Sequence, residues 1–171
     1  DKAMFGLTLI GEVATGCMVQ RAGAKSGEDV FVTGTIGHGY IGLEDAKAGR
    51  SSLCRDLFEH PQPPLAFALA AAPYISSAVD VSDGLAADLG HICKASGCGM
   101  ALNISAIPFA DEDPMYLMAQ LNGGDDYQLA FTAASENYDA LMQVAVDHGI
   151  QLVKIGHVVD GKELILLDSD G

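Results

Sequence analysis

The chain has 171 residues, and 49% of them are hydrophobic, which is sufficient for one globular core. A formal net charge of −14 at pH 7 repels the phosphate backbone of nucleic acids and anionic lipid surfaces, which makes both poor partners. The sequence has no run of about 18 apolar residues and no basic-then-apolar leader. It therefore predicts no membrane span and no export, and the expected location is the cytoplasm.

The first part of the chain predicts two strands, over residues 5–13 and 29–33. Arg21 lies in the glycine- and alanine-rich connection between them. Three glycines follow the second strand, but their spacing matches neither a P-loop nor a dinucleotide-binding fingerprint, so we interpret them as turn residues. They are Gly34, Gly37 and Gly39.

Three short helices are predicted next, over residues 44–48, 51–59 and 64–72. Gly49 and the proline-rich stretch 60–64 separate them. Leu65, Leu69 and Ala72 recur on one face of the third helix. We expect this stripe to pack against the sheet.

The central stretch, residues 78–89, changes from a short apolar strand to an amphipathic helix. The strand ends at Asp80, and the helix is predicted to begin at about Ser82, which we interpret as its N-cap. Apolar residues then recur at i, i+4 and i+7 until Gly97 ends the helix. The apolar residues are Leu85, Leu89 and Ile92, and the residues assigned to the opposite face are Asp88, His91 and Lys94.

Two carboxylates and a hydroxyl therefore meet at a helix N-terminus. The free N–H groups and the positive end of the helix dipole attract anions, and Asp80 and Asp83 are suited to hold the Mg²⁺ that accompanies a polyphosphate. Because the chain has only nine Lys and Arg, divalent cations held by aspartates are one way to neutralise such a ligand. The simpler interpretation of this motif alone is a capped helix with dipole-stabilised aspartates.

The last part of the chain predicts six elements. The helices are one over 115–121, with its Met and Leu residues in the core, and one that begins near 135 and ends at 149. The strands are predicted over 99–104, 127–132, 150–159 and 163–167. Gly123 and Gly124 permit positive φ and place Asp125 and Asp126 at the mouth of the sheet. We expect this turn to lift Asp125 away from the helix that begins at Ser82.

The two closing strands flank Asp160 and Gly161, a turn that predicts a hairpin. Strands interleaved with helices and closed by a hairpin predict an α/β (α+β) sandwich. We expect a mixed β-sheet covered by helices on one side, in a single domain over residues 1–171.

Four ordered segments of the sequence carry a resemblance to a known family. They are Asp-Val-Ser-Asp-Gly-Leu at 80–85, Gly-Gly-Asp-Asp-Tyr-Gln-Leu at 123–129, and the upstream stretches 21–28 and 32–37. Together they resemble the C-terminal half of the bacterial thiamine-monophosphate kinases, in the AIR-synthase-related superfamily. The resemblance implies that fold, and transfer of a phosphoryl group from ATP to thiamine phosphate with Mg²⁺.

The resemblance also assigns roles to residues of this chain. It implies that Asp80 and Asp83 are catalytic and bind Mg²⁺, that Ser82 and Arg21 bind the nucleotide, and that Asp125 contacts the substrate. The family most often has Glu at the position of Asp125 and at that of Gln128.

The resemblance further implies that the chain is the C-terminal half of a longer enzyme whose N-terminal, ATP-binding half is missing. We expect the chain alone to be inactive, and the resemblance implies a homodimer for the full-length enzyme. Two alternatives stay open. One is another ATP-using member of the superfamily, such as a selenophosphate or aminoimidazole-ribonucleotide synthetase, and the other is a non-catalytic binding domain.

Overall fold

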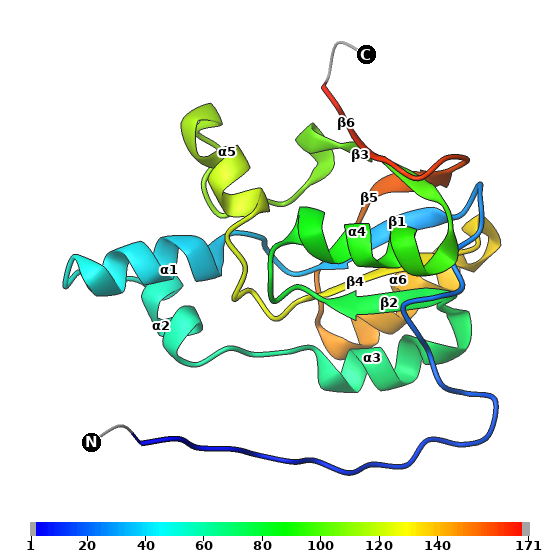
Figure 1. Cartoon of the computed structure of the whole chain (residues 1–171), viewed down its shortest axis with the longest axis horizontal. Coiled ribbons are helices and arrows are strands. Elements are labelled where there is room, and N and C mark those ends of the chain that lie inside the picture. The colour runs from blue at the N-terminus through cyan, green and yellow to red at the C-terminus, as the bar shows by residue number, and fades with distance from the viewer. Residues whose placement is uncertain (1–2, 169–171) are drawn as a thin grey trace.

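The computed structural model describes residues 3–168. Its centre is a six-stranded mixed sheet in the order β2-β4-β1-β5-β3-β6 (Figure 1). All neighbouring strands are antiparallel except β3 and β6, which are parallel. The strands are β1 (Asp29–Thr33), β2 (Ser77–Asp80), β3 (Gly99–Asn103), β4 (Leu129–Ala133), β5 (Leu152–Val159) and β6 (Leu164–Leu167).

Six α-helices connect these strands, together with three short 3-10 helices. The α-helices are α1 (His38–Lys47), α2 (Leu53–Glu59), α3 (Leu65–Ala71), α4 (Leu85–Ser96), α5 (Pro114–Leu121) and α6 (Tyr138–His148). The 3-10 helices are η1 (Ala72–Tyr74), η2 (Ile104–Ala106) and η3 (Ser135–Asn137). No helix among residues 3–168 is long and apolar enough to cross a membrane.

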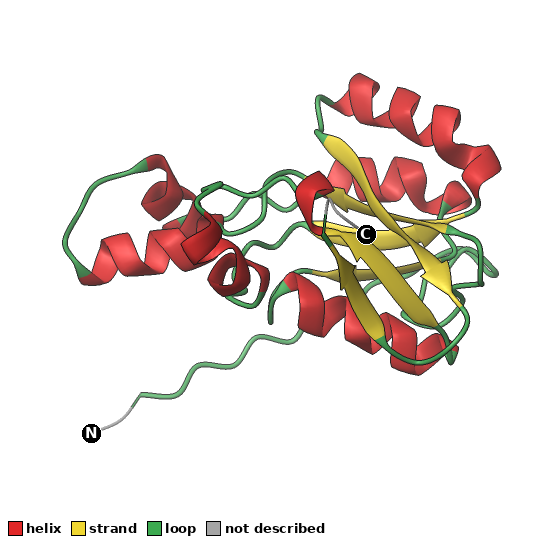
Figure 2. Cartoon of the chain, turned by 90° about the horizontal axis from the view of Figure 1, so that it is seen from above, coloured by secondary structure: helices red, strands yellow, loops and turns green. Residues whose placement is uncertain are grey.

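The helices cover both faces of the sheet, which corrects the expectation of a one-sided cover (Figure 2). Side chains alternate between the two faces of a strand, and all five residues of the central strand β1 are buried. Val30 and Val32 contribute to the core under α4, whereas Phe31 contributes to the core under α3 and α6. Phe31 stacks on Phe131 there, with ring centroids 5.2 Å apart.

The expected hairpin between the last two strands is wrong. β5 and β6 do not pair; β3 lies between them, antiparallel to β5 and parallel to β6. The turn at 160–161 therefore carries the chain over the end of β3. A turn sequence fixes only a local reversal, and the pairing follows from which strand fills the space.

The segment 5–13 forms no strand and lies outside the sheet, contrary to expectation (Figure 1). Its apolar side chains are exposed, with Phe5 94% and Ile10 95% accessible. Alternating apolar residues predict a strand only where a partner strand is present to accept the backbone hydrogen bonds.

Two predicted core stripes on helices are also corrected. Leu65 and Leu69 of α3 are 68% and 80% exposed, because the helix turns Phe67 and Ala71 to the core instead. In α5 the methionines are exposed, and the residues that face inward are Gln120 and Leu121. In α3 the buried stripe lies on a different face from the one chosen by counting apolar residues, whereas in α5 Leu121 is buried as expected and only the methionines are not.

Candidate functional site

The candidate site begins where β2 ends at Asp80 and α4 starts at Leu85. Ser82 is not the N-cap that the sequence predicts: the helix begins three residues later, and Gly84 precedes it with a φ of 115° and no side-chain cap. The carboxylate of Asp88, one turn into α4, instead accepts hydrogen bonds from the backbone N–H groups of Ser82 and Asp83, both at 3.0 Å.

Asp88 is therefore a buried residue of the site and not a member of the solvent-facing stripe. Burial raises the pKa of its carboxyl group, the two backbone hydrogen bonds lower it, and the nearby charges of Asp83 and Asp80 raise it. The residue type and spacing predicted an exposed position, whereas the need to bind two loop N–H groups places it inside. The useful signal would have been an acid one turn into a helix that lacks its own side-chain cap.

Two carboxylates, which are ligands that Mg²⁺ prefers, and one imidazole gather at this point, and Asp80, which was also predicted to bind the metal, is not among these three groups. Asp83, Asp88 and His91 each offer a ligand atom, and these atoms all lie within 4.8 Å of one another. Asp80 and Asp83 are exposed, and no ion pair among residues 3–168 involves Asp80, Asp83 or Asp88. Carboxylates that lie close together and have no ion-pair partner among residues 3–168 fit a divalent cation.

The Gly-Gly loop lies directly against the start of α4. The N–H of Asp125 donates to the carbonyl oxygen of Ser82 at 3.0 Å, and the N–H of Tyr127 donates to the carbonyl oxygen of Val81 at 2.8 Å. The turn does not lift Asp125 away from Ser82, which corrects that expectation. Gly124, with a φ of 68°, permits this close approach, because a Cβ at that position would clash with the Ser82 carbonyl.

The backbone of this loop takes an unusual conformation at two non-glycine residues. Asp125 and Tyr127 have φ values of 58° and 51°, in the left-handed region. The hydroxyl of Tyr127 donates to Oδ1 of Asp125 at 3.1 Å, and this hydrogen bond is the main reason why the pKa of Tyr127 is raised. Asp125 is thereby presented beside the strand end with its carboxylate oriented.

Asp126, the next residue, is 7% exposed and binds the start of α1. Its carboxylate accepts from the N–H of Gly37, at 3.0 and 2.9 Å, and from the N–H of Gly39, at 2.9 Å. Burial raises its pKa to about 6, against the opposing effect of these hydrogen bonds. The glycines after β1 thus surround a side-chain carboxylate, which is a role that neither the turn interpretation nor the motif predicted.

Arg21 lies apart from this cluster. Its carbonyl oxygen accepts a hydrogen bond from Ser96, the last residue of α4, at 3.4 Å, whereas Ser82 precedes the first residue of that helix. Twelve helical residues span roughly 18 Å at about 1.5 Å each, so α4 separates the backbone of Arg21 from Ser82. The structure brings together Asp80, Ser82, Asp83 and Asp125 and leaves Arg21, which is exposed, at the other end.

The architecture is a mixed sheet with helices on both faces and with two acidic loops, residues 80–84 and 122–128, joined at one end. This arrangement defines a class of α/β protein. The model of the family described as "AIR synthase related protein, C-terminal domain" matches residues 25–169, so the chain belongs to this family.

Its relatives within that family are more specific. The chain is 36% identical over 181 aligned residues to the thiamine-monophosphate kinase of Escherichia coli K12, covering 96% of this chain and 55% of the relative. A crystal structure of the thiamine-monophosphate kinase from Stenotrophomonas maltophilia K279a shares 31% identity at a TM-score of 0.84, covering 90% of this chain and 54% of that one.

One further solved structure carries ligands in its description. It is described as AaThiL complexed with AMPPCP and TMP, and it matches at 27% identity and a TM-score of 0.74, over 86% of this chain and 50% of that one. The chain therefore spans about half the length of the curated relatives that it matches.

Proposed function

We propose that this chain is the C-terminal half of a thiamine-monophosphate kinase, which transfers the γ-phosphoryl group of ATP to the phosphate of thiamine phosphate. The observation that carries the proposal is the junction of the two acidic loops, where the N–H of Asp125 binds the carbonyl of Ser82. The relatives at 31% identity or more support a kinase over the synthetases of the superfamily, because each is named as a thiamine-monophosphate kinase.

In this proposal each residue of the candidate site has one role. Asp80 and Asp83 hold Mg²⁺, which neutralises phosphate charge when it is bound. Ser82 contacts the nucleotide phosphates, Asp88 fixes the loop that carries Ser82 and Asp83, and Asp125 contacts the acceptor. Phosphoryl transfer depends mainly on positioning and charge neutralisation, so a rigid junction of loops is the contribution expected of this half.

The remaining parts of the proposal concern the whole protein. Arg21 is assigned to the nucleotide phosphate at a site that the N-terminal half completes. Within this chain Arg21 lies at the end of α4 that is distant from Ser82. That half is the expected partner, and a homodimer and a cytoplasmic location stay predictions.

A steady-state assay of the full-length protein with ATP, Mg²⁺ and thiamine phosphate tests the proposal. We expect formation of thiamine diphosphate that stops when the metal is chelated, and no turnover by the 171-residue chain alone. If the full-length protein forms no thiamine diphosphate, the assignment is overturned, whether or not it phosphorylates another acceptor. Robust turnover by the isolated chain would show that the N-terminal half is not required for activity.

A further inference from the structure

Asp126 connects the Gly-Gly loop, residues 122–128, to the start of α1. Its carboxylate accepts hydrogen bonds from the backbone N–H groups of Gly37 and Gly39, at 2.9 and 3.0 Å. Gly37 is the N-cap of α1, and a glycine has no side chain that could cap the helix. Asp126, which follows Gly39 by 87 residues, therefore binds the free N–H groups of this helix in place of a local cap.

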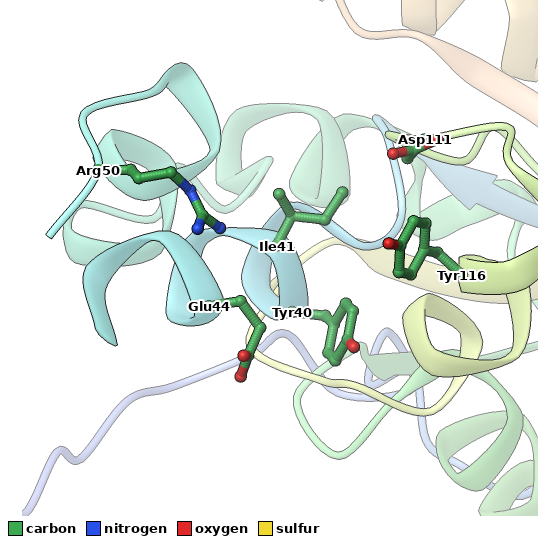
Figure 3. Close-up of a pocket in the computed structure, with 6 residues that line it drawn as sticks. All are labelled: Tyr40, Ile41, Glu44, Arg50, Asp111 and Tyr116. Atoms are coloured by element: carbon green, nitrogen blue, oxygen red, sulfur yellow. The ribbon is translucent and has the colours of Figure 1, made fainter. Parts of the chain in front are cut away.

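Apolar packing contributes little to holding α1 against the Gly-Gly loop. The residues of α1 that are buried are Gly39, Gly42 and Asp45, so this helix, which lies wholly within the described part of the chain, buries no large apolar side chain. On the side that faces α5, a pocket of about 350 Å³ opens beside Tyr40 (Figure 3). Because buried apolar surface is the usual source of helix docking energy, the position of the first turn of α1 depends strongly on Asp126.

The backbones of α1 and of the loop are in direct contact. A Cβ built on Gly39 would lie 2.2 Å from the carbonyl oxygen of Gly124 and 2.6 Å from the carbonyl carbon of Asp125. No side chain fits between the two segments, so none can absorb a displacement. A shift of the first turn of α1 consequently moves the backbone that carries Asp125.

The residues on both sides of Asp126 have a left-handed backbone, with φ values of 58° for Asp125 and 51° for Tyr127. Non-glycine residues keep this conformation only where their surroundings fix it. On one side, the N–H groups of Asp125 and Tyr127 donate to the carbonyl oxygens of Ser82 and Val81. On the other side, the carboxylate of Asp126 binds α1, so the loop is fixed from two directions.

We propose that Asp126 is a positioning residue for the acceptor: by binding the first turn of α1, it holds the backbone of Asp125 where the carboxylate of Asp125 meets thiamine phosphate. Asp126 is itself buried and faces backbone N–H groups, so it acts through its neighbour. The inference rests on the proposed function, and it adds the residue that links α1 to the acceptor.

Asp126→Ala in the full-length protein removes the hydrogen bonds to α1. We expect the KM for thiamine phosphate to rise by about tenfold and the KM for ATP to change by less than about threefold, because the displacement falls on Asp125. Asp126→Asn keeps Oδ1, which accepts from both glycines, and should recover most of the affinity for the acceptor. An Asn variant as impaired as the Ala variant would show that the charge of Asp126 acts directly, and would overturn the positioning role.

Ser77→Ala is the matched control for the loss of a buried hydrogen bond. The hydroxyl of Ser77 is fully buried and pairs with that of Thr132 at 2.8 Å, at the start of β2, whereas the acidic loop follows the end of that strand. The control should lower the melting temperature and leave both KM values unchanged. An equal rise of both KM values in Asp126→Ala, or the same acceptor effect in Ser77→Ala, would reduce the role of Asp126 to general stability and overturn the inference.

A double-mutant cycle tests whether Asp126 acts through Asp125. If it does, adding Asp126→Ala to Asp125→Ala should change the KM for thiamine phosphate by less than about twofold, since the group that Asp126 positions is already absent. Independent residues would instead multiply their effects, to about a hundredfold in the double variant. The multiplied effect would overturn the inference while the kinase assignment stands.

Hydrogen–deuterium exchange of the full-length protein gives a readout that needs no turnover. In Asp126→Ala the backbone amides of residues 122–128 should lose about tenfold or more in protection, whereas Ser77→Ala should leave them unchanged. If Asp126→Ala does not fold, Asp126→Ser, whose hydroxyl is too short to reach both glycines, replaces it with the same expectations. If the native protein does not phosphorylate thiamine phosphate, the proposed function fails, and unchanged exchange in the variant would separately overturn the role of Asp126 in fixing the loop.

Discussion

The backbone N–H of Asp125 donates a hydrogen bond of 3.0 Å to the carbonyl oxygen of Ser82. These residues belong to different motifs, and the bond continues the antiparallel pairing of β2 with β4 beyond the strand ends. The two acidic loops therefore form one unit, and a change in the backbone of either loop is expected to displace the carboxylates of both.

Gly124→Ala tests how tightly this unit is packed. A Cβ at this position clashes with the Ser82 carbonyl, and the φ of 68° is unfavourable for alanine, so we expect a loss of about 2 kcal/mol or more in the free energy of unfolding. Gly90→Ala is the control. Gly90 lies within α4 with open space around it, and alanine there is expected to stabilise the protein by about 0.5–1 kcal/mol. Urea denaturation measures both, and equal effects of the two substitutions would contradict the close approach.

Asp80→Asn tests the proposed metal site in the full-length protein. The substitution is nearly isosteric and Asp80 is exposed, so the melting temperature should change little. We expect kcat to fall by at least about a hundredfold, because one metal-holding charge is lost. Asp160→Asn, at an exposed turn, removes the same charge away from the site and should leave kcat unchanged. A kcat for Asp80→Asn within a few-fold of the native value would return Asp80 to the role of an ordinary strand-end residue.

The raised pKa of Asp126 predicts a specific dependence of the free energy of unfolding on pH. Its pKa is raised from an ordinary value of 3.8 to about 6 in the folded protein, so the folded state holds a proton that the unfolded state has released. The resulting stabilisation is complete below pH 3.8 and is lost as the pH rises through about 6, by about 3 kcal/mol in total.

The difference between native protein and Asp126→Asn isolates this contribution from those of other acids. The stability of the native protein relative to the variant should fall between pH 4 and pH 7 in urea denaturation experiments. A difference that stays constant across this range would show that Asp126 titrates normally.

Asp125→Ala tests whether this residue serves the acceptor. The proposed function assigns Asp125 to the acceptor, and a carboxylate that holds no cation repels nucleotide phosphate. We therefore expect the KM for thiamine phosphate to rise by about tenfold and the KM for ATP to change by less than about threefold. Asp125→Glu retains the charge and should recover most of the affinity for the acceptor. An equal rise in both KM values would assign Asp125 to the nucleotide and metal site.

Much of the fold could be predicted, because local pattern and local structure agree in most elements. The helix over Leu85–Ser96 and the strand over Asp29–Thr33 follow from apolar periodicity and a closing glycine. The errors occur where pairing over long distances decides. The turn at Asp160 and Gly161 indicated a hairpin, but β3 occupies the place beside β5.

The candidate site was predicted in its residue types and only partly in its geometry. The acidic motif located Asp80 and Asp83, yet the buried acids Asp88 and Asp126, which organise the loops, were assigned to solvent or given no role. Both are held by backbone N–H groups from segments distant in sequence or outside the helix, and residue spacing does not reveal such donors. Burial of a carboxylate is visible only when the donors that compensate for it are in place.

The position of β6 beside β3 means that the C-terminal strand protects the border of the sheet. If residues after Val159 were removed, for instance by proteolysis, the row of backbone N–H and C=O groups on β3 would lose its partner and become the outermost edge. Met100 and Leu102, both fully buried in the intact chain, would then border on solvent. An unprotected apolar edge of this kind recruits further strands from other molecules, so a shortened chain should self-associate even though both cores lie largely upstream of the cut.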